Sequence, residues 1–512
     1  MDKLNLPEFI EGYGPVIPYT GVFDPDRVKD KVARKSKSNH PDDQKLHQDL
    51  SALMNQLNLK DGMTFSFHHH LRNGDFVLNL VMAEVHRLGL KDIRVAASSL
   101  FPCHAPLVAM MEDGTVTDIH TDYMSGPVAE AVSQGKLKNP AVMTTHGGRP
   151  RGIAQGDVHI DVAFIAAPGA DLAGNLNGVA GPSACGTLGY AIADAAYADI
   201  VVAVTDHLEP YPLCPVEITE NQVDFVVEVN SIGDPKGIVS GTTQITKDPI
   251  GLKIAADTQK VLEASGLLED GLSFQTGAGG ISLAVAKELE LYMKDQGIRG
   301  SFASGGITGS IVQMMEAGLF RALWDVQCFD LEAVQSYRKN PNHMAMSGDL
   351  YGNPHNKGAV VNHLDIVILG ATEMDKDFNV NVTTGSTGMI MGGSGGHADT
   401  AAGAKLTVIV SKLVSARIPL IKDRVTTITT PGETVDVLVT DRGIAVNPRR
   451  PELAEALKRA GLQVITIEAL QGEAERLTGK PQPIQTTDRI VAVVEYRDGS
   501  VLDVVYQVKV PE

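Results

Sequence analysis

The sequence predicts an α/β protein that is a tandem duplication of one Rossmann-like parallel-sheet domain, with the active site in the cleft between the two copies. Three observations support this fold class. Matching segments recur in the same order, and short apolar runs alternate with amphipathic helices. The 51 glycines and 5% aromatic residues suit a chain with many tight strand-to-helix turns. At 512 residues the chain is also too long for one ordinary core.

The duplication is indicated by four pairs of similar segments. LKDGMTFSFHHH pairs with LEDGLSFQTGAG, HIDVAFIAAPGADLAGNLN with HLDIVILGATEMDKDFNVN, ADAAYADIVVAV with ADTAAGAKLTVIV, and VDFVVEV with VDVLVTD. The separation stays between 204 residues, from His159 to His363, and 212 residues, from Val223 to Val435. Chance could supply one such pair, but not four in register. A period this long means that each copy is a whole domain.

The alternation of elements indicates buried parallel strands joined by crossover helices. Apolar runs such as DVAFIAA, DIVVAVT, DIVILG and LTVIVSK follow helical stretches such as GDFVLNLVMAEVHRLGL and ISLAVAKELELYMKDQGI. The turn-rich stretch 230–249 marks the seam. We therefore predict an N-terminal arm over 1–45 that wraps the first domain, a first α/β domain over 46–236 and a second over 237–512.

Composition excludes several classes of function. A net charge of −18 argues against a nucleic-acid partner, and no long uninterrupted apolar run predicts a membrane span. The acidic N-terminus MDKLNLPEFIEGYG is unlike a signal peptide. Four scattered cysteines form no metal pair or disulfide framework, which fits a reducing compartment. We expect a cytoplasmic protein that attracts anionic substrates by local positive groups.

Four glycine-rich turns are candidates for ligand binding, because ligands of parallel α/β sheets bind beyond the carboxyl ends of the strands. They are HHHLRNGD, QTGAGGIS, ASGGITGS and GSTGMIMGGSGGHAD. Glycine lets the backbone approach a ligand, and amides at a helix start favour negative charge. None of the four is a Walker A motif, and no acidic residue completes a dinucleotide fingerprint. Each turn taken alone is weak evidence for a ligand site, because a glycine-rich turn between a strand and a helix is more often purely structural.

Together these motifs resemble a known family. The order of the motifs in the second copy is similar to that of acyl-CoA transferases: QTGAGGIS, ASGGITGSIVQMMEAGLF, HLDIVILGATEMD, GGSGGHAD and RVTTITTPGETVDVLVTDRGIA. The other half of those enzymes is matched in the first copy by HIDVAFIAAPGADLAGNLN. With its N-terminal arm and FSFHHHLRNGD loop, nearly the whole chain resembles the alpha subunits of citrate lyase. The resemblance implies a CoA-transferase-like fold.

The resemblance also implies the reaction and its partners. It implies the exchange of acetyl for citryl on the thioester of an acyl carrier protein, with citrate and an acetyl thioester as substrates. No tightly bound cofactor is implied: a CoA-like prosthetic arm comes from the carrier, with acetyl-CoA as a surrogate. The implied partners are the lyase (beta) and acyl carrier (gamma) subunits of an oligomer.

The sequence departs from ordinary members of this superfamily at one position. Those enzymes have a nucleophilic glutamate at the position that aligns with Gly305, which follows Ser304 in ASGGITGS. Glycine cannot form an acyl-enzyme bond. The resemblance to citrate lyase alpha subunits implies transfer without a covalent intermediate, through a mixed anhydride of citrate and acetate. Glu373, after the DIVILGAT strand, is the one credible alternative nucleophile.

Candidate site residues follow from these turns. The glycines Gly305, Gly306, Gly395 and Gly396, with His397, are the candidates for the catalytic loops that face developing negative charge. The thioester end is assigned to Gln275, Gly277, Gly279, Gly280, Gly392 and Gly393. For citrate we predict His68, His70, Arg72, Asn175 and Glu373. For Asn175, which shares a repeat position with Asn379, a common turn role is the alternative.

The histidine triplet leaves three interpretations open. In an extended chain His68 and His70 point one way and His69 the other, so three rings do not converge on one ion and we predict no metal site. Either His68, His70 and Arg72 bind an anion, or His69 is a packed core residue and Arg72 is a surface cation. The loop THGGRPRG is a second positive stretch, for which a solvated hairpin is an equal alternative.

Three other functions compete with this one. A sugar-phosphate isomerase would need one such unit and not a fused pair. A conventional transferase with a covalent glutamyl-CoA intermediate would act on another carboxylic acid. A non-enzymatic effector-binding module would need a DNA-binding helix-turn-helix and a basic face, and the sequence has neither. Reductive trapping with borohydride separates the covalent enzyme from the others.

Overall fold

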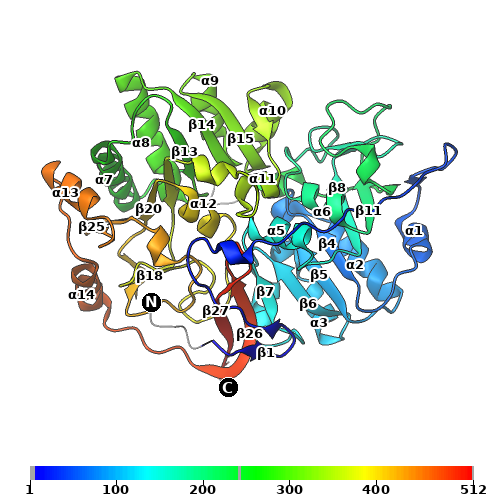
Figure 1. The fold of residues 1–512 in the computed structure, drawn as a ribbon, viewed down its shortest axis with the longest axis horizontal. Coiled ribbons are helices and arrows are strands. Elements are labelled where there is room, and N and C mark those ends of the chain that lie inside the picture. The colour runs from blue at the N-terminus through cyan, green and yellow to red at the C-terminus, as the bar shows by residue number, and fades with distance from the viewer. Residues whose placement is uncertain (1–5, 240–243, 510–512) are drawn as a thin grey trace.

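The computed structural model describes residues 6–239 and 244–509, and it contains two large sheets side by side (Figure 1). The first has ten strands in the order β27-β26-β7-β6-β5-β4-β8-β11-β12-β3, and the second has eight in the order β16-β15-β14-β13-β17-β20-β24-β25. Residues 240–243 of the predicted seam lie outside the described part. No helix in the described ranges is long and apolar enough to cross a membrane.

The first sheet is built from strands of the first domain and one C-terminal hairpin. Its strands are β3 (Leu46–His47), β4 (Thr64–Phe67), β5 (Ile93–Ala97), β6 (Val116–Thr121), β7 (Ala141–Met143), β8 (Val162–Ala167), β11 (Ile200–Thr205), β12 (Phe225–Glu228), β26 (Thr486–Glu495) and β27 (Val501–Val508). All neighbours pair in parallel except β26 with β27. The predicted parallel α/β class is therefore confirmed.

The second sheet repeats the first strand for strand over seven positions. Its strands are β13 (Ser273–Thr276), β14 (Gly300–Ile307), β15 (Phe320–Cys328), β16 (His343–Ala345), β17 (Ile366–Leu369), β20 (Leu406–Val410), β24 (Val437–Thr440) and β25 (Gly443–Val446). The order β7-β6-β5-β4-β8-β11-β12 corresponds to β16-β15-β14-β13-β17-β20-β24. Only the eighth position differs, because β3 pairs in parallel and β25 antiparallel. This correspondence supports the duplication inferred from the repeats.

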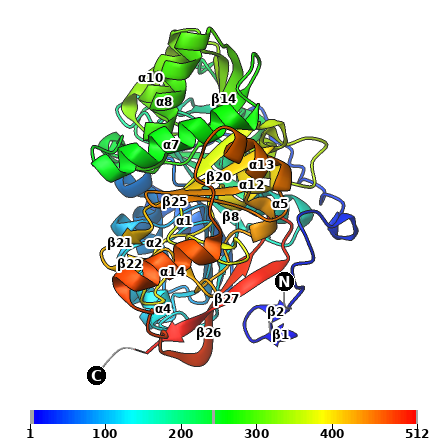
Figure 2. The ribbon, with the colours of Figure 1, turned by 90° about the vertical axis from the view of Figure 1, so that its left-hand side faces the viewer.

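Helices lie between the strands along the chain and cover the sheets (Figures 1 and 2). The first domain contains α1 (Leu50–Gln56), α2 (Val77–Arg87), α3 (Leu107–Glu112), α4 (Pro127–Ser133), α5 (Gly148–Gln155) and α6 (Ala191–Tyr197). The second contains α7 (Pro249–Ser265), α8 (Gly280–Gln296), α9 (Gly309–Glu316), α10 (Leu331–Lys339), α11 (Gly348–Gly352), α12 (His397–Gly403), α13 (Pro451–Arg459) and α14 (Ile467–Thr478). The short helix α11 packs on α5 and α6 and so joins the domains.

Local chemistry explains why helices begin directly after strands. Asp75 closes the HHHLRNGD turn and caps α2, because its carboxylate accepts from the amides of Val77 and Leu78. The apolar residues of α2 then recur on one face, so that face is buried against the sheet. In the second domain Asp248 caps α7 by accepting from the Gly251 amide. Because Asp75 is held at the start of α2, the HHHLRNGD turn keeps the residues before Asp75 at the carboxyl edge of the first sheet.

The C-terminal hairpin departs from the predicted domain boundaries. β26 pairs in parallel with β7, so residues 486–508 extend the sheet of the first domain although the prediction placed all of 237–512 in the second. In Figure 1 this hairpin (red) lies beside β7 (cyan). An apolar strand of the hairpin covers the edge that β7 would otherwise expose. A repeat comparison could not reveal this crossing, because the hairpin has no counterpart in the first copy.

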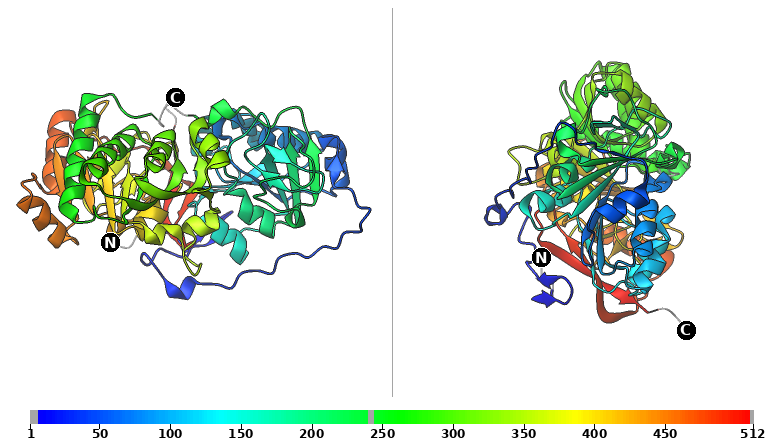
Figure 3. Two further views of the ribbon diagram at one scale, coloured as in Figure 1. Left: turned by 90° about the horizontal axis from the view of Figure 1, so that it is seen from above. Right: turned by 90° about the vertical axis from the view of Figure 1, so that its right-hand side faces the viewer.

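The N-terminal arm runs in an extended form along the first domain (Figure 3). The Val32 amide donates to the Ala154 carbonyl, and β3 pairs with β12. Near its start the arm also reaches the hairpin and the second domain, because Pro18 bridges to Val501 and the Tyr19 hydroxyl donates to Glu433. The arm therefore contacts more than the first domain that it was predicted to wrap.

Candidate active site in the cleft between the domains

A cavity of about 630 Å³ opens between the two domains, at the carboxyl ends of strands from both sheets. The first domain lines it with His69, Arg72, Ser99, Phe101, Tyr123, His146 and Tyr190. The second lines it with three loops, 275–279, 369–372 and 393–397, together with Gly306, Val326, Gln327, Phe329, Tyr351 and Val382. This is the interdomain cleft that the sequence predicts, with the glycine-rich turns of both copies facing one space.

Many of the predicted site residues meet in this cleft. Its lining includes Arg72, Gln275, Gly277, Gly279, Gly306, Gly393, Gly395, Gly396 and His397. The loop that contains Gly395 crosses into the first domain: the Gly395 amide donates to the Asp122 carbonyl at 3.2 Å, and its carbonyl accepts from the His146 amide at 2.8 Å. The Gly277 amide donates to the Ile368 carbonyl. These two amides are therefore structural donors and are not free to bind a ligand.

The side chains of the histidine triplet point to alternate faces, as expected. The ring that faces the cleft is that of His69, the residue that the core interpretation placed in the packed interior. His68 and His70 lie behind the site with parallel rings and no place in the cleft lining. His68 Nε2 lies 3.2 Å from Asp194 Oδ2, and His70 Nε2 bonds to the Ala166 carbonyl. His69 lines the cleft instead, with its Nδ1 2.7 Å from Ser98 Oγ. The positions of His68 and His70 therefore do not support a role for them in binding citrate.

Arg72 is placed in the cleft without a carboxylate partner in the described ranges. Its guanidinium carbon lies 4.9 Å from the ring centre of Phe329 and 5.5 Å from that of Phe101. Its Nη1 is buried and has no hydrogen-bond partner among the described residues. Burial lowers the pKa of the guanidinium. A cation held between two aromatic rings and left unpaired is a ready binding group for an anion.

Two glycines of the ASGGITGS motif lie within strand β14 and not in the turn after it. A register shift of the β14–β15 pairing falls between Gly305 and Gly306. Gly305 has φ +101°, and a Cβ there would lie 2.5 Å from Gln275 Nε2. A Cβ at Gly306 would lie 2.2 Å from the Phe329 ring. Both glycines therefore make room for side chains that line the cleft, and Gly305 itself does not line it.

Gln275 is fixed by one neighbour on the adjacent strand β14 and by one on the helix α11. Its Oε1 accepts from Ser304 Oγ at 2.9 Å, and its Nε2 donates to the Tyr351 hydroxyl at 2.8 Å. Tyr351 in turn fits over Gly396, where a Cβ would lie 2.2 Å from the hydroxyl oxygen. His397 is similarly occupied, with Nδ1 2.7 Å from Thr430 Oγ1 and Nε2 2.9 Å from the Gly370 carbonyl. Burial lowers the pKa of His397 to about 4, so the ring is neutral.

Other predicted residues lie outside the cleft lining. Glu373 is buried against Lys422, Thr426 and Asn381 and lines a separate pocket of about 450 Å³. Asn175 donates to Asp171 and Glu220, and its repeat partner Asn379 donates to Asp375 in the same way. The predicted alternative of a shared turn role fits both asparagines. Gly280 and Gly392 also lie outside the lining: the first begins α8, and the second packs on the Val382 carbonyl.

The cleft contains a histidine–carboxylate pair that the sequence reasoning missed. His146 Nδ1 lies 2.8 Å from Asp122 Oδ2, and Asp122 is fully buried, which raises the pKa of its carboxyl. The His146 ring stacks near Tyr190 and His69, with centroids 4.5 Å and 5.6 Å away. The loop THGGRPRG is therefore not a solvated hairpin. The histidine and the basic residues of this loop could have indicated a functional role from the sequence. The segment TDYMSG, which contributes Asp122, contains no motif that would have done so.

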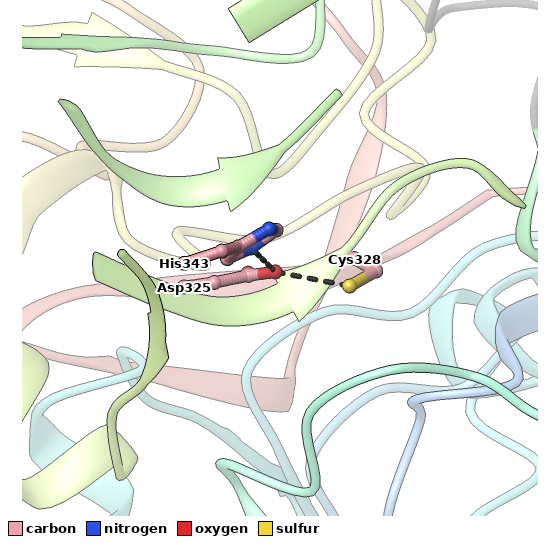
Figure 4. Close-up of side chains that lie close together, drawn as sticks. All are labelled: Asp325, Cys328 and His343. Atoms are coloured by element: carbon pink, nitrogen blue, oxygen red, sulfur yellow. Dashed lines mark hydrogen bonds and ion pairs between the residues drawn. The ribbon is translucent and has the colours of Figure 1, made fainter. Parts of the chain in front are cut away.

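Beneath the cleft, three polar side chains form a closed cluster (Figure 4). Asp325 Oδ2 accepts from His343 Nε2 at 2.9 Å and from Cys328 Sγ at 3.0 Å. These are ligand types that can bind a metal, and their atoms lie within 4.8 Å of one another. All three side chains are buried, and both His343 and Cys328 bond to the Asp325 carboxylate. The cluster anchors the end of β15, from which Gln327 reaches the cleft and donates to the His69 carbonyl.

Comparison with known proteins identifies the family. The model of the family described as "Citrate lyase, alpha subunit (CitF)" matches residues 43–508. The chain belongs to the citrate lyase alpha subunit family. It is 50% identical to the citrate lyase alpha chain of Escherichia coli (strain K12) over 467 residues, covering 91% of this chain and 92% of that one. It is 49% identical to the citrate lyase alpha chain of Haemophilus influenzae, covering 91% and 93%.

Solved structures agree with membership of the citrate lyase alpha subunit family. An alpha subunit of citrate lyase from Streptococcus mutans, solved in complex with citrate, has a TM-score of 0.95 and 45% identity, covering 100% of this chain and 99% of that one. The alpha subunit of a malonate decarboxylase from Acinetobacter baumannii has a TM-score of 0.63 and 16% identity, covering 86% and 94%. The second comparison shows a shared fold alone.

Proposed function

We propose that this chain exchanges acetyl for citryl on a carrier thioester, so that acetyl-S-carrier and citrate give citryl-S-carrier and acetate. Family membership supports the broad assignment. The observation that carries the proposal is the unpaired Arg72 guanidinium in a cleft built from both domains. In a chain with a net charge of −18, such a cation is the local attraction that a citrate trianion needs.

Two groups of the first domain are suited to bind citrate carboxylates. Arg72 offers a planar fork of donors, and its cation lies between Phe101 and Phe329. The Asp122 carboxylate fixes the ring of His146 through Nδ1, and this leaves Nε2 on the side of the glycine loop, 3.3 Å from where a Cβ of Gly395 would lie. We assign to these two side chains the role that the sequence had divided among His68, His70 and Arg72.

The proposed chemistry needs no enzyme nucleophile. A citrate carboxylate oxygen attacks the acetyl carbonyl, a tetrahedral oxyanion forms, and the carrier thiolate leaves. The mixed anhydride of acetate and citrate is then attacked by that thiolate at the citryl carbonyl. Acetate departs with the bridging oxygen, which came from citrate. The protein must hold the two reactants in contact, stabilise the oxyanions and exclude water.

The positions of Gly305 and Glu373 favour this route over a covalent one. Gly305 has no side chain, and Gln275 fills the space where one would begin. Glu373 is 1% exposed, bonds to Lys422, Thr426 and Asn381, and does not line the cleft. A carboxylate held by these partners does not face the cleft, and both of its oxygens already accept hydrogen bonds, so it lacks the free oxygen that a nucleophile needs.

The remaining parts of the proposal concern the partners. A cavity of about 630 Å³ is within the range of roughly 300–1,000 Å³ typical of small-molecule sites. We propose that it receives citrate together with the thioester end of a CoA-like arm on an acyl carrier (gamma) subunit. The lyase (beta) subunit would then cleave the citryl thioester. We place this assembly in the cytoplasm as an oligomer.

Purified chain incubated with acetyl-CoA and citrate tests the proposal, with a panel of other di- and tricarboxylates beside it. We expect citryl-CoA and acetate in equal amounts, and a preference for citrate over shorter acids. Borohydride added after acetyl-CoA should leave the chain unlabelled, because no glutamyl thioester forms. The absence of exchange with every acid would overturn the proposal.

A further inference from the structure

A second polar pocket of about 290 Å³ lies under the N-terminal arm and shares no lining residue with the cleft. We call it the arm pocket. The arm covers it with Tyr13, Arg27 and Lys29, strands β5 and β6 contribute Arg94 and His120, and α5 contributes Arg151. The turn between β26 and β27 closes one side with Gly499. Three parts of the chain that are distant in sequence therefore meet around one space.

The arm pocket is locally positive in a strongly acidic protein. Its charged lining consists of Arg27, Lys29, Arg94, Arg151, Asp118, Asp157 and Glu495. Burial raises the pKa of the Glu495 carboxyl, which accepts a hydrogen bond from the Tyr13 hydroxyl. Four cationic side chains therefore line the space beside three carboxyl groups, against a net charge of −18 for the whole chain.

Arg151 presents an incomplete set of hydrogen bonds to the arm pocket. It is 3% exposed, and its Nη1 donates to Gln155 and Asp157. Its Nε is buried and has no partner among the described residues. Gly499 approaches the other side of the guanidinium, where a Cβ would lie 2.5 Å from Nη2. A buried donor without a partner costs about 1–3 kcal/mol, so this geometry favours a bound acceptor.

His120 adds a second buried atom without a partner, and Arg94 adds a half-exposed cation. His120 is 8% exposed, and its Nδ1 is buried without a hydrogen-bond partner in the described ranges. Burial and the charges of Arg149, Arg94 and Arg151 lower the pKa of His120 to about 3. The nearest approach of Arg94 to a carboxylate is 3.6 Å, to Asp118, both of whose oxygens accept from Asn139. Arg94 therefore has a long ion pair but no side-chain hydrogen bond in the described ranges, so its donors can bind another oxygen acceptor.

We propose that the arm pocket binds a small oxyanion, a carboxylate or a phosphate group, between Arg94, His120 and Arg151. Because Arg27 and Lys29 belong to the arm, a bound anion also holds the arm against the first sheet. The side-chain bonds that already hold the arm here are those of Tyr13 to Glu495, Arg27 to Asp498, Lys29 to Asp157, and Gln155 to the Lys29 carbonyl. The proposal is independent of the reaction in the cleft.

Hydrogen–deuterium exchange of residues 12–29 in the full chain tests the site directly. Sodium phosphate and sodium succinate are titrated separately against sodium chloride at matched ionic strength. Arg72→Gln serves as the background, so that anions bound in the cleft do not contribute. We expect saturable slowing of exchange in the arm, and the anion with the lower Kd identifies the source as phosphorylated or carboxylic.

Two arginine variants provide the comparison. Arg94→Gln removes a half-exposed side chain that makes no hydrogen bond in the described ranges, so the fold should persist, and we expect the Kd to rise about tenfold or more. Arg424→Gln is the matched control, because Arg424 is also exposed and lies 3.7 Å from Asp503, away from the arm pocket. The proposal is overturned if neither anion slows exchange in the arm more than chloride does. It is also overturned if the anions slow exchange in Arg94→Gln as strongly as in its parent protein.

Discussion

The imidazole Nδ1 of His146 is bonded to Asp122 Oδ2 at 2.8 Å, and the pair joins the ends of two neighbouring strands at the wall of the cleft. Asp122 is fully buried, whereas the His146 side chain stays 14% exposed. The buried carboxylate therefore orients a ring whose other nitrogen faces the substrate space. This arrangement suits His146 to the citrate-binding role proposed for it, with Asp122 as its positioning residue.

Asp122→Asn should weaken citrate use while the chain stays folded. The amide oxygen can still accept from Nδ1, but it no longer stabilises positive charge on the ring when Nε2 binds a carboxylate. We expect the KM for citrate to rise about tenfold or more, from the loss of a charge-assisted bond. The KM for acetyl-CoA should stay near the wild-type value. Asp113→Asn is the control, because Asp113 pairs with His86 at 3.0 Å on the surface.

Arg72→Ala tests the anion interpretation of the opening histidine loop. Loss of a bidentate contact costs on the order of 1.5–3 kcal/mol, so the KM for citrate should rise about ten- to a hundredfold. The KM for the acyl donor should hardly change. Steady-state kinetics with each substrate varied in turn measures the split, and Arg424→Ala is the exposed-arginine control. Unaltered citrate saturation in Arg72→Ala would contradict the assignment.

Gly305→Ala should damage the site more than a comparable glycine does elsewhere. Gly305 has φ +101°, and its new Cβ would lie 2.5 Å from Gln275 Nε2, so the side chain that bonds to Tyr351 must move. Gly318→Ala shares the positive φ, +74°, but meets nothing within 4 Å. Both variants should lose about 1 kcal/mol of stability from backbone strain. Only Gly305→Ala should lower kcat/KM, and equal kinetics in the two would refute the packing argument.

The stability of the protein should fall in mild acid because buried histidines resist protonation. Burial and the neighbouring His68 lower the pKa of His70 to about 4 from its ordinary 6.5. Between these values the unfolded chain binds a proton that the folded chain does not, so this contribution is complete above 6.5 and is lost as pH falls toward 4. His70→Gln should reduce the slope in that window by about 1.4 kcal/mol per pH unit. His86→Gln, at an exposed site, is the control in denaturant titrations.

The sequence predicted the duplicated parallel fold because apolar strand runs and repeats are local signals. It also placed His69 on the face opposite His68 and His70, since alternation along an extended chain is a local rule. Local rules could not predict which of the two faces points into the cleft. That outcome depends on the contacts of His68 with Asp194 and of His70 with Ala166, which lie more than 90 residues away in the sequence. The structure therefore does not support the binding role predicted for His68 and His70.

The residues that the sequence reasoning missed come from strand neighbours that no motif records. Asp122 and His146 meet because β6 and β7 are adjacent, and the hairpin 486–508 joins β7 although it lies at the other end of the chain. Gly305 was singled out from the sequence as the position that lacks a nucleophile, and its catalytic role stays a prediction. The physical reason for a glycine there, the space taken by Gln275, depends on the pairing of β13 with β14.

Single-turnover transfer with citrate labelled by ¹⁸O in its carboxylates tests the central claim most directly. Enzyme in excess over acetyl-CoA allows each site one reaction, and mass spectrometry then gives the label in the released acetate. Direct attack by citrate predicts citryl-CoA together with acetate that carries one ¹⁸O, because the bridging oxygen of the anhydride leaves with acetate. Citryl-CoA accompanied by unlabelled acetate would contradict the account, since that oxygen would have come from a carboxylate of the enzyme.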